Sequence, residues 1–200
     1  LIRDNMSELL SYVETQNLLD ELPNEHQKLV GEVVPNQISV GGIQRVLQNL
    51  LNERVSIRDL PTILEGISEA CAFTRNVTQL TEHVRSRLAR QISEQNSTED
   101  NFIPLVTLSA EWEQIFSDSI LDQGEDKQLS MAPSQLQRFI GAVRTTLDEL
   151  ADKEDPPVVL TSPTARPFVR SIIERFRPTT SIMSQNELHP KAKIKTLGQI

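Results

Sequence analysis

The sequence contains little of what disulfide-bonded, metal-binding or membrane-spanning proteins need. Its 200 residues include one cysteine, three histidines, one tryptophan and one tyrosine, and aromatic residues make up 4% of the total. A single cysteine excludes an intrachain disulfide and any cysteine-rich metal site. No run of about 18 apolar residues occurs, so the sequence predicts no membrane-spanning helix. No secretory signal peptide is recognisable either.

The motifs of common active sites are also missing. The sequence has no G-x-x-x-x-G-K-[ST], no G-x-G-x-x-G, no G-x-S-x-G and no H-E-x-x-H. His26, His83 and His189 lie far apart and lack partners at metal-ligand spacing. Cys71 falls on the apolar face of a predicted helix, where a buried structural thiol is expected rather than a nucleophile. We therefore expect a protein that is not an enzyme, with no catalytic residues, cofactor or metal.

Charge is unevenly distributed along the chain. The formal net charge is −8, but residues 160–200 carry seven basic and two acidic side chains. The acidic whole argues against nucleic acid as the main partner, and no tryptophan or tyrosine lies near the basic residues to stack on bases. Three interpretations of the basic residues stay open: a solvated surface, which is favoured, then a protein-binding surface, then a nucleic-acid site. The basic residues are Arg166, Arg170, Arg175, Arg177, Lys191, Lys193 and Lys195, of which the four arginines are the candidates for protein binding.

A polar segment divides the sequence into two parts. Residues 94–101 contain no aliphatic side chain and predict a linker or exposed loop. Before it, residues 1–93 predict an all-helical subdomain. After it, residues 102–200 predict a small α/β subdomain with a short, mostly parallel sheet. The expected fold class is therefore α+β.

The helical part carries capping signals before its apolar runs. Ser11 with Glu14 predicts a helix through Leu22, and Asn24 with Gln27 predicts another through Val34. Ser39, Asp59 and Asn76 are expected to cap three further helices, over about 40–51, 60–71 and 77–92. Between the first two of these, Val55-Ser56-Ile57 interrupts the helical period.

The second part alternates strand and helix patterns. Residues 102–108 predict a strand, and Pro104 within it suggests a position at the sheet edge. The other expected strands are 156–160, 180–183 and 194–197. Apolar residues predict a helix over 136–150 and a second that opens at Ser162 or Thr164.

The segment from Gln44 to Leu64 closely resembles the C-terminal cytoplasmic region of the flagellar and type III secretion export-gate family. The resemblance covers nearly the whole chain in collinear order. It also includes residues 14–20, 33–35, 81–90, 165–170, 184–187 and 196–200. It implies that this chain corresponds to the last two subdomains of the cytoplasmic half. A chain that opens within an amphipathic pattern fits such a fragment.

The resemblance implies a function in protein export. Family members form a homo-oligomeric ring, a nonamer in the intact protein, below the secretion channel at the cytoplasmic face of the bacterial inner membrane. The ring receives export substrates and chaperone–substrate complexes and cooperates with the export ATPase complex. Flagellar use is preferred over the equivalent virulence system. The chaperone groove is expected upstream of Leu1, and membrane attachment through the missing N-terminal half. A monomeric helical adaptor is the alternative from a different class.

A ring requires a heterologous interface, in which two different surfaces meet and the rotation between subunits closes the ring. We expect the helical part to provide this interface. Arg54, Arg58 and Asp59 surround the interruption between two helices. Our hypothesis is that they make polar contacts at or near this interface. The alternative, that Arg58 and Asp59 only stabilise the interruption locally, is equally supported.

Overall fold

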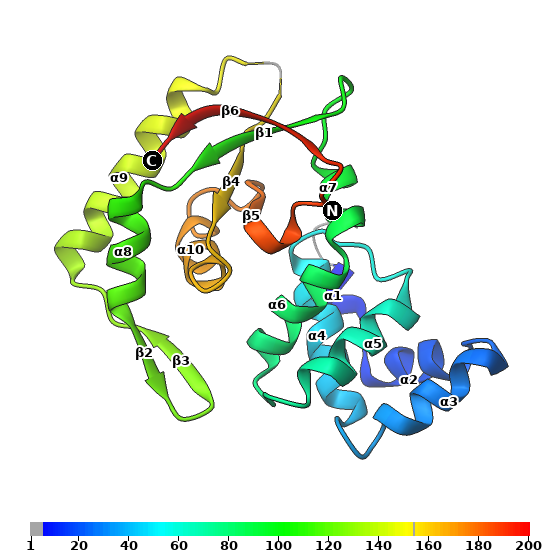
Figure 1. Ribbon diagram of the computed structural model, residues 1–200. Helices are drawn as coiled ribbons and strands as arrows, with labels where there is room; N and C mark the ends of the chain where they lie inside the picture. The colour runs from blue at the N-terminus through cyan, green and yellow to red at the C-terminus, as the bar shows by residue number, and fades with distance from the viewer. Residues whose placement is uncertain (1–5, 154) are drawn as a thin grey trace. The chain divides into compact units, whose positions relative to one another are not determined.

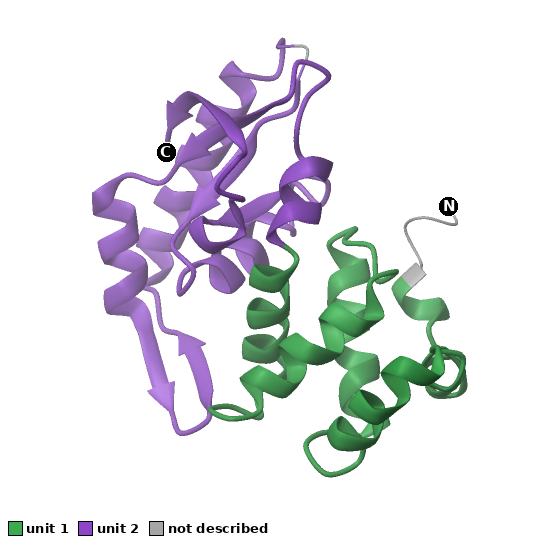
Figure 2. Ribbon diagram, turned by 45° about the vertical axis from the view of Figure 1, so that its right-hand side comes forward, with its two compact units in different colours: residues 1–88 green, residues 89–200 purple. Residues whose placement is uncertain are grey.

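The computed structural model describes residues 6–153 and 155–200 (Figure 1). The chain forms two compact units, residues 1–88 and residues 89–200, which Figure 2 shows in different colours. Within the described residues unit 1 is all-helical, and unit 2 combines helices with a parallel sheet. The predicted α+β class is confirmed. No helix in this described part has the length and apolar character to cross a bilayer.

Local sequence signals set most helix starts of unit 1. The Ser11 hydroxyl accepts a hydrogen bond from the Glu14 N–H (3.1 Å), while the Glu14 carboxylate accepts one from the Ser11 N–H (2.8 Å). Ser39, Asp59 and Asn76 cap the last three helices, as predicted. The helices are α1 (Met6–Leu9), α2 (Tyr12–Asp20), α3 (Asn24–Val33), α4 (Val40–Asn52), α5 (Leu60–Ala70) and α6 (Val77–Arg87).

The cap predicted at Asn24 is wrong, because Asn24 is already the first residue of α3 and Pro23 is its N-cap. Gln27 has a different role from the one expected. Its side-chain amide donates to the carbonyl oxygens of Leu19 (3.0 Å) and Leu22 (2.8 Å). It thereby satisfies acceptors that the end of α2 would otherwise leave without a partner.

The apolar face of α4 forms the centre of unit 1. Val46, Leu47 and Leu50 are completely buried, as their helical spacing predicts. Helix α4 contacts α1, α2 and α6, and α5 contacts α3 and α6. At Gly66 of α5 a Cβ atom would lie 3.3 Å from the Cα atom of Val84. The missing side chain therefore permits the close approach of α5 and α6.

The boundary between the units lies before the predicted linker. The helix expected over 77–92 is interrupted at Leu88, so that α6 ends unit 1 and α7 (Ala89–Gln95) begins unit 2. Residues 94–101, predicted as a linker, therefore belong to unit 2, and the first two of them lie in α7.

Ser93 attaches α7 to the rest of unit 2. Its side chain is buried, donates a hydrogen bond to the Glu187 carbonyl (2.8 Å) and accepts one from the His189 N–H (2.9 Å). These partners lie more than ninety positions later in the sequence. Because the contact is this distant, the local composition around Ser93 does not reveal it.

The described strands of unit 2 form a parallel sheet in the order β5-β4-β1-β6 and a separate two-stranded antiparallel hairpin, β2-β3. The elements after α7 are β1 (Phe102–Thr107), α8 (Ala110–Ser119), β2 (Ile120–Gln123), β3 (Asp126–Leu129), α9 (Pro133–Glu149), β4 (Val158–Thr161), α10 (Arg166–Ile173), β5 (Ile182–Ser184), η1 (Gln185–Glu187) and β6 (Lys193–Gln199). The four predicted strands and the parallel sheet are thus confirmed, with small shifts of their ends.

The edge position predicted from Pro104 is wrong, because β1 lies between β4 and β6. The register explains why proline is tolerated. Pro104 is paired with Lys195 of β6, whereas the pairing with β4 begins one residue later, at Leu105. Proline therefore occupies the part of β1 that has a neighbour on one side only, where its missing N–H breaks no ladder.

The β2-β3 hairpin lies outside the sequence predictions. Residues 121–128 are all exposed, so they lack the apolar alternation that marks a half-buried strand. Gly124 in the turn has a φ of 71°, a conformation that glycine adopts without steric cost. Helix α8, which precedes the hairpin, is capped by Ser109, whose hydroxyl accepts from the Trp112 N–H (3.3 Å).

The core of unit 2 contains an aromatic cluster. Trp112 and Phe116 of α8 meet Phe139 of α9 edge to face, with ring centroids 5.2 and 4.9 Å apart. Val106 of β1 and Val159 of β4 belong to the same buried cluster. The helices thus cover one face of the sheet.

A buried ion pair between Arg166 and Glu187 connects α10 to η1. The Arg166 and Glu187 side chains are 2% and 1% exposed, and Arg166 Nε lies 3.5 Å from Glu187 Oε2. Arg166 Nη1 also donates to the Ile182 carbonyl (2.9 Å), and the Glu187 carboxylate accepts from the Ser184 N–H (3.4 Å). The pair therefore joins α10, β5 and η1.

Replacing Arg166 by methionine leaves the Glu187 carboxylate buried without its cation. We expect this to lower the free energy of unfolding of unit 2 by about 3–5 kcal/mol. Trp112 is the only tryptophan and is buried in unit 2, so its fluorescence in a urea titration follows this unit. The double variant Arg166→Met/Glu187→Leu removes both charges and should lose less. A double variant less stable than the single one would contradict this account.

Candidate interaction surfaces

The segment between α4 and α5, residues 53–59, holds the three residues expected at an interface; we call it the break segment. Helix α4 ends with two closing hydrogen bonds: the Arg54 N–H donates to the Leu51 carbonyl and the Val55 N–H to the Leu50 carbonyl, both at 2.9 Å. This pattern satisfies the last carbonyl groups of the helix and needs a left-handed residue directly after the cap. That residue is Arg54, with a φ of 61°.

An arginine at this position is costly. Left-handed backbone brings Cβ too close to the following carbonyl oxygen, which costs roughly 1–2 kcal/mol, whereas glycine pays no such penalty. The Arg54 side chain is exposed and so is not required by the core. A place for Arg54 at an interface stays a prediction.

The other two predicted residues differ in their surroundings. Asp59 caps α5, where its carboxylate accepts a hydrogen bond from the Thr62 N–H (3.3 Å). The local structural role considered for Asp59 is therefore real, although its side chain is also exposed. Arg58 is exposed, and its backbone N–H donates to the Ser56 hydroxyl (3.3 Å). Arg54 and Arg58 thus lie four positions apart on an accessible segment.

The break segment is attached to α6 by an ion pair. Arg85 Nη1 lies 3.5 Å from Glu53 Oε2, and the two side chains are 3% and 14% exposed. Glu53 is the C-cap of α4, so the guanidinium also lies close to the negative end of that helix. The arrangement fixes the first residue of the break segment on the body of unit 1.

The four arginines expected to bind a protein do not form one basic surface. Arg166 is buried and cannot contact a partner protein. Its prediction as a protein-binding residue is therefore wrong. Arg170 is 14% exposed and lies 3.4 Å from the carboxylate four residues later. Arg177 is paired with Asp148, while Arg175 is exposed. Three of the four arginines are thus paired with carboxylates: Arg170 with one in its own helical turn, and Arg166 and Arg177 with carboxylates distant in sequence.

Basic side chains gather instead around an open depression of about 410 Å³ in unit 2, which we call the basic pocket. It lies where β1 and β6 begin, and α7 forms another part of its wall. Its lining is Arg90, Ser93, Glu94, Ser97, Asn101, His189, Lys191, Ala192 and Lys193.

A tight turn places two members of the basic pocket. The Ala192 N–H donates to the His189 carbonyl (2.8 Å), and the Lys191 N–H donates to His189 Nδ1 (3.2 Å). This turn presents Lys191 at the pocket. Sequence reasoning grouped Lys191 and Lys193 with the basic residues but missed Arg90, which comes from α7. No local signal connects Arg90 with them.

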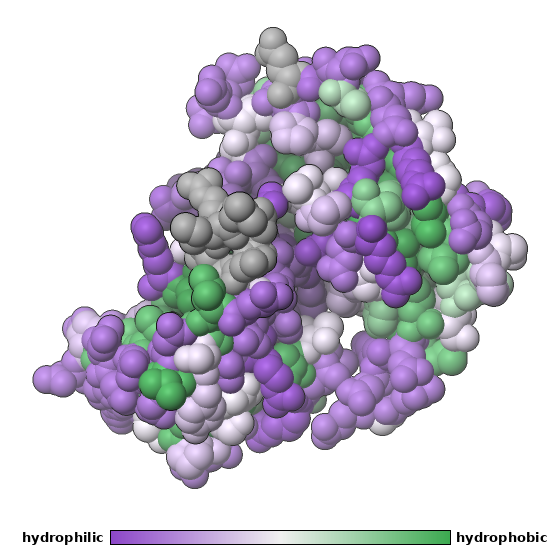
Figure 3. Space-filling model, turned by 180° about the vertical axis from the view of Figure 1, so that it is seen from behind, coloured by the Kyte–Doolittle hydropathy of each residue, from purple (hydrophilic) through white to green (hydrophobic). Residues whose placement is uncertain are grey.

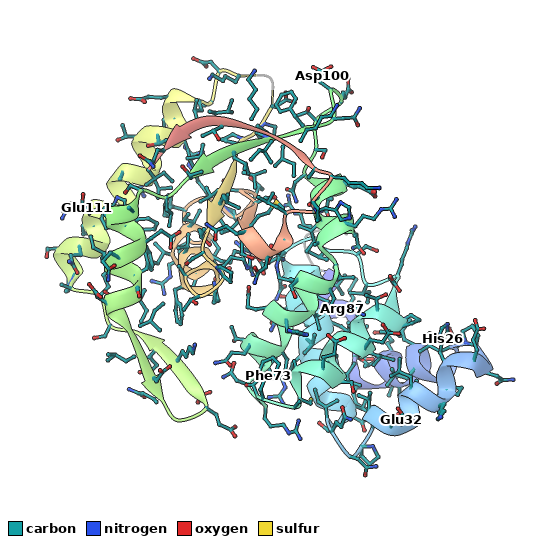
Figure 4. The ribbon with its side chains drawn as sticks, viewed as in Figure 1. His26, Glu32, Phe73, Arg87, Asp100 and Glu111 are labelled. Carbon is teal, nitrogen blue, oxygen red and sulfur yellow. The ribbon has the colours of Figure 1, made fainter. Side chains whose placement is uncertain are left out.

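The histidines stay apart within the described residues. His26 lies on α3, where Figure 4 labels it, and His83 lies on α6, 2.9 Å from Glu69 Oε2. His189 belongs to the turn of unit 2. Among residues 6–153 and 155–200, no three histidine, cysteine, aspartate or glutamate side chains cluster as metal ligands would.

Comparison with known sequences gives consistent matches. A family model described as the FHIPEP family matches residues 1–193. The chain is 53% identical over 200 residues to flagellar biosynthesis protein FlhA of Caulobacter vibrioides and 33% identical over 199 residues to that of Bacillus subtilis. It is 27% identical over 200 residues to low calcium response locus protein D of Yersinia pestis. Each match covers the whole chain but only 28–29% of the relative.

Solved structures share the fold over the entire chain. The nonameric EPEC SctV-C matches with a TM-score of 0.87 and 27% identity, over 60% of that chain. The C-terminal domain of InvA matches with a TM-score of 0.91, 28% identity and 60% coverage. The Chlamydia pneumoniae CdsV and CdsO complex gives a TM-score of 0.89, 29% identity and 58% coverage.

Replacing Arg54 by glycine tests the strain in the break segment. The change removes the clash of the left-handed conformation and should raise the stability of unit 1 by about 1 kcal/mol. Arg45→Gly is the matched control, because Arg45 is also exposed but lies inside α4, where glycine should cost about 1 kcal/mol. Thermal unfolding followed by helical circular dichroism measures both. Destabilisation by both variants would contradict the assigned strain.

Proposed function

This chain belongs to the FHIPEP family, and we propose that it is part of the cytoplasmic platform of a bacterial flagellar protein export gate. In this role it acts as a non-catalytic scaffold that receives export substrates and chaperone–substrate complexes. The observation that carries the proposal is the 53% identity to flagellar FlhA of Caulobacter vibrioides over all 200 residues. The identity to the low calcium response protein of Yersinia pestis is 27%, so the flagellar system is preferred.

We propose that the intact protein works as a ring. A solved relative that shares the fold of this entire chain is a nonamer. A closed ring needs two different surfaces on each subunit, which meet on neighbouring copies. The break segment is suited to one of them, because Arg54 and Arg58 are exposed there.

Other proteins of the export apparatus are proposed partners. The relative CdsV was solved in complex with a second protein, CdsO. By analogy, we propose that export chaperones with their substrates and the export ATPase complex bind to assemblies of this chain. The chain spans 29% of the length of its flagellar relatives. We propose that the chaperone-docking residues lie in segments outside it. The proposed location is the cytoplasmic face of the inner membrane.

Charge reversal at the break segment tests the ring. Arg54→Glu/Arg58→Glu should weaken self-association about tenfold or more, because two exposed cations become anions at the proposed interface. Sedimentation velocity over a range of concentrations, on the full-length cytosolic part of the gene product, measures this. Thermal stability should change little.

A core variant serves as the control for this experiment, and two outcomes would contradict the proposal. Leu50→Ala is the contrast, because it truncates a completely buried side chain and should cost about 2–5 kcal/mol of stability. An unfolded double-arginine variant would show that the arginines support the fold instead. Unchanged self-association with an intact fold would refute their place at the interface and favour a monomeric adaptor.

Loss of the chain in the cell tests the flagellar assignment. Deleting the coding segment for residues 1–200 should abolish swimming and remove flagellar filament protein from the culture medium, and a plasmid copy should restore both. Immunoblots of medium and cells measure export directly. Normal swimming after deletion, together with loss of another secreted protein, would assign the chain to a non-flagellar secretion system.

A further inference from the structure

Strand β6 leaves one side of the sheet open. It is the outermost strand in the order β5-β4-β1-β6 and pairs with β1 alone among the described residues. Its seven residues make it longer than β5, at the opposite edge, which has three residues that are all buried. An edge strand presents backbone N–H and C=O groups that another extended chain can pair with. Of the two edges, β6 is the accessible one.

The side chains of β6 alternate in chemistry. Lys193, Ile194, Lys195 and Thr196 are exposed. Ile194 is 53% exposed and is one of few large apolar residues left open in the described chain. Since successive residues of a strand point to opposite faces, the two lysines share one face and Ile194 lies on the other. Lys195 Nζ also lies 5.4 Å from the centre of the Phe102 ring, so that face is in part preorganised.

The basic pocket extends this edge at its beginning. Lys193 is both the first residue of β6 and part of the pocket lining. Lys191 and Arg90 add two further cations there, and Arg90 is partly balanced by Glu94 at 3.1 Å. Basic side chains therefore extend from the pocket to Lys193 and Lys195 of β6. Figure 3 shows the molecule from behind, where green hydrophobic patches lie among purple hydrophilic residues.

We propose that the outer edge of β6, together with the basic pocket, binds an extended acidic segment of a partner protein by strand addition. The segment pairs its backbone with β6 and places carboxylates opposite Lys193 and Lys195 and an apolar side chain beside Ile194. Its acidic end enters the basic pocket. Main-chain hydrogen bonds supply affinity in this mode, and the alternate side chains supply specificity.

Charge decides which strands are accepted. Lysines on an edge strand prevent pairing with apolar or basic strands, since burying an unpaired ammonium group is costly. Opposite a carboxylate the same lysines are compensated. The same two lysines therefore have two effects: they prevent pairing with apolar or basic strands, and they favour pairing with acidic ones.

This inference is independent of the proposed ring. It concerns unit 2 alone and uses no residue of the break segment. A chain that forms no ring would still bind the acidic segment, and a chain that fails to bind it could still form rings. The two proposals therefore fail separately.

Fluorescence anisotropy with a labelled peptide of Glu-Val repeats tests the proposal at low salt. The chain should bind this peptide, and Lys193→Glu/Lys195→Glu should weaken binding about tenfold or more. Lys127→Glu/Lys153→Glu is the matched control, because both lysines are exposed in unit 2 and the net charge changes equally. The control variant should bind within about twofold of the unchanged chain. Trp112 fluorescence confirms that each variant is folded.

A second probe separates strand addition from simple charge attraction. The same peptide methylated on its backbone nitrogens keeps its carboxylates but has lost its N–H donors, so its binding should fall by about tenfold or more. Because this test uses the unchanged chain, it does not depend on any variant folding.

Three results would overturn the proposal. Equal binding of the methylated peptide would leave only electrostatic attraction. Tighter binding of an oligothymidine strand than of the Glu-Val peptide, lost in the Lys193→Glu/Lys195→Glu variant, would identify a nucleic-acid site. Loss of self-association in the same variant, without loss of peptide binding, would show that a second copy covers β6.

Discussion

Unit 2 depends on a single buried carboxylate. Glu187 neutralises Arg166 inside the core, and its carboxylate accepts from the Ser184 backbone. Its carbonyl accepts from the Ser93 hydroxyl, which attaches α7 to the same point. Helices α7 and α10, strand β5 and η1 thus converge on one residue in a three-residue 3₁₀ turn. A charge pair that excludes water so completely is stable only when its geometry is right, and it therefore selects one arrangement of these segments.

Those elements that local sequence encodes were predicted well, and those that distant contacts create were not. The caps at Ser11, Ser39, Asp59 and Asn76 act within one helical turn, so the local sequence is enough to predict them. The unit boundary depends instead on Ser93 meeting residues more than ninety positions later. The exposed β2-β3 hairpin has no apolar pattern from which its strands could be predicted.

The candidate surfaces show the same division. The break segment was found from an interruption in helical period, but its most informative property, the left-handed Arg54, is visible only in the backbone. The predicted basic group consists of residues close in sequence, yet Arg166 is buried and its cation is paired with a buried carboxylate. The accessible basic surface instead combines Arg90 with Lys191 and Lys193. A sum of charges along a chain does not give the charge of a surface.

The place of β1 in the sheet has a consequence for synthesis. Its neighbours β4 and β6 come much later in the chain, and the pairing of Phe102 with Lys193 joins residues from opposite ends of unit 2. On the ribosome, the central strand must wait for its last partner while unit 1, built from local helical contacts, is already complete. Translation thus imposes an order of folding, in which β1 remains an edge strand until residues 193–199 emerge.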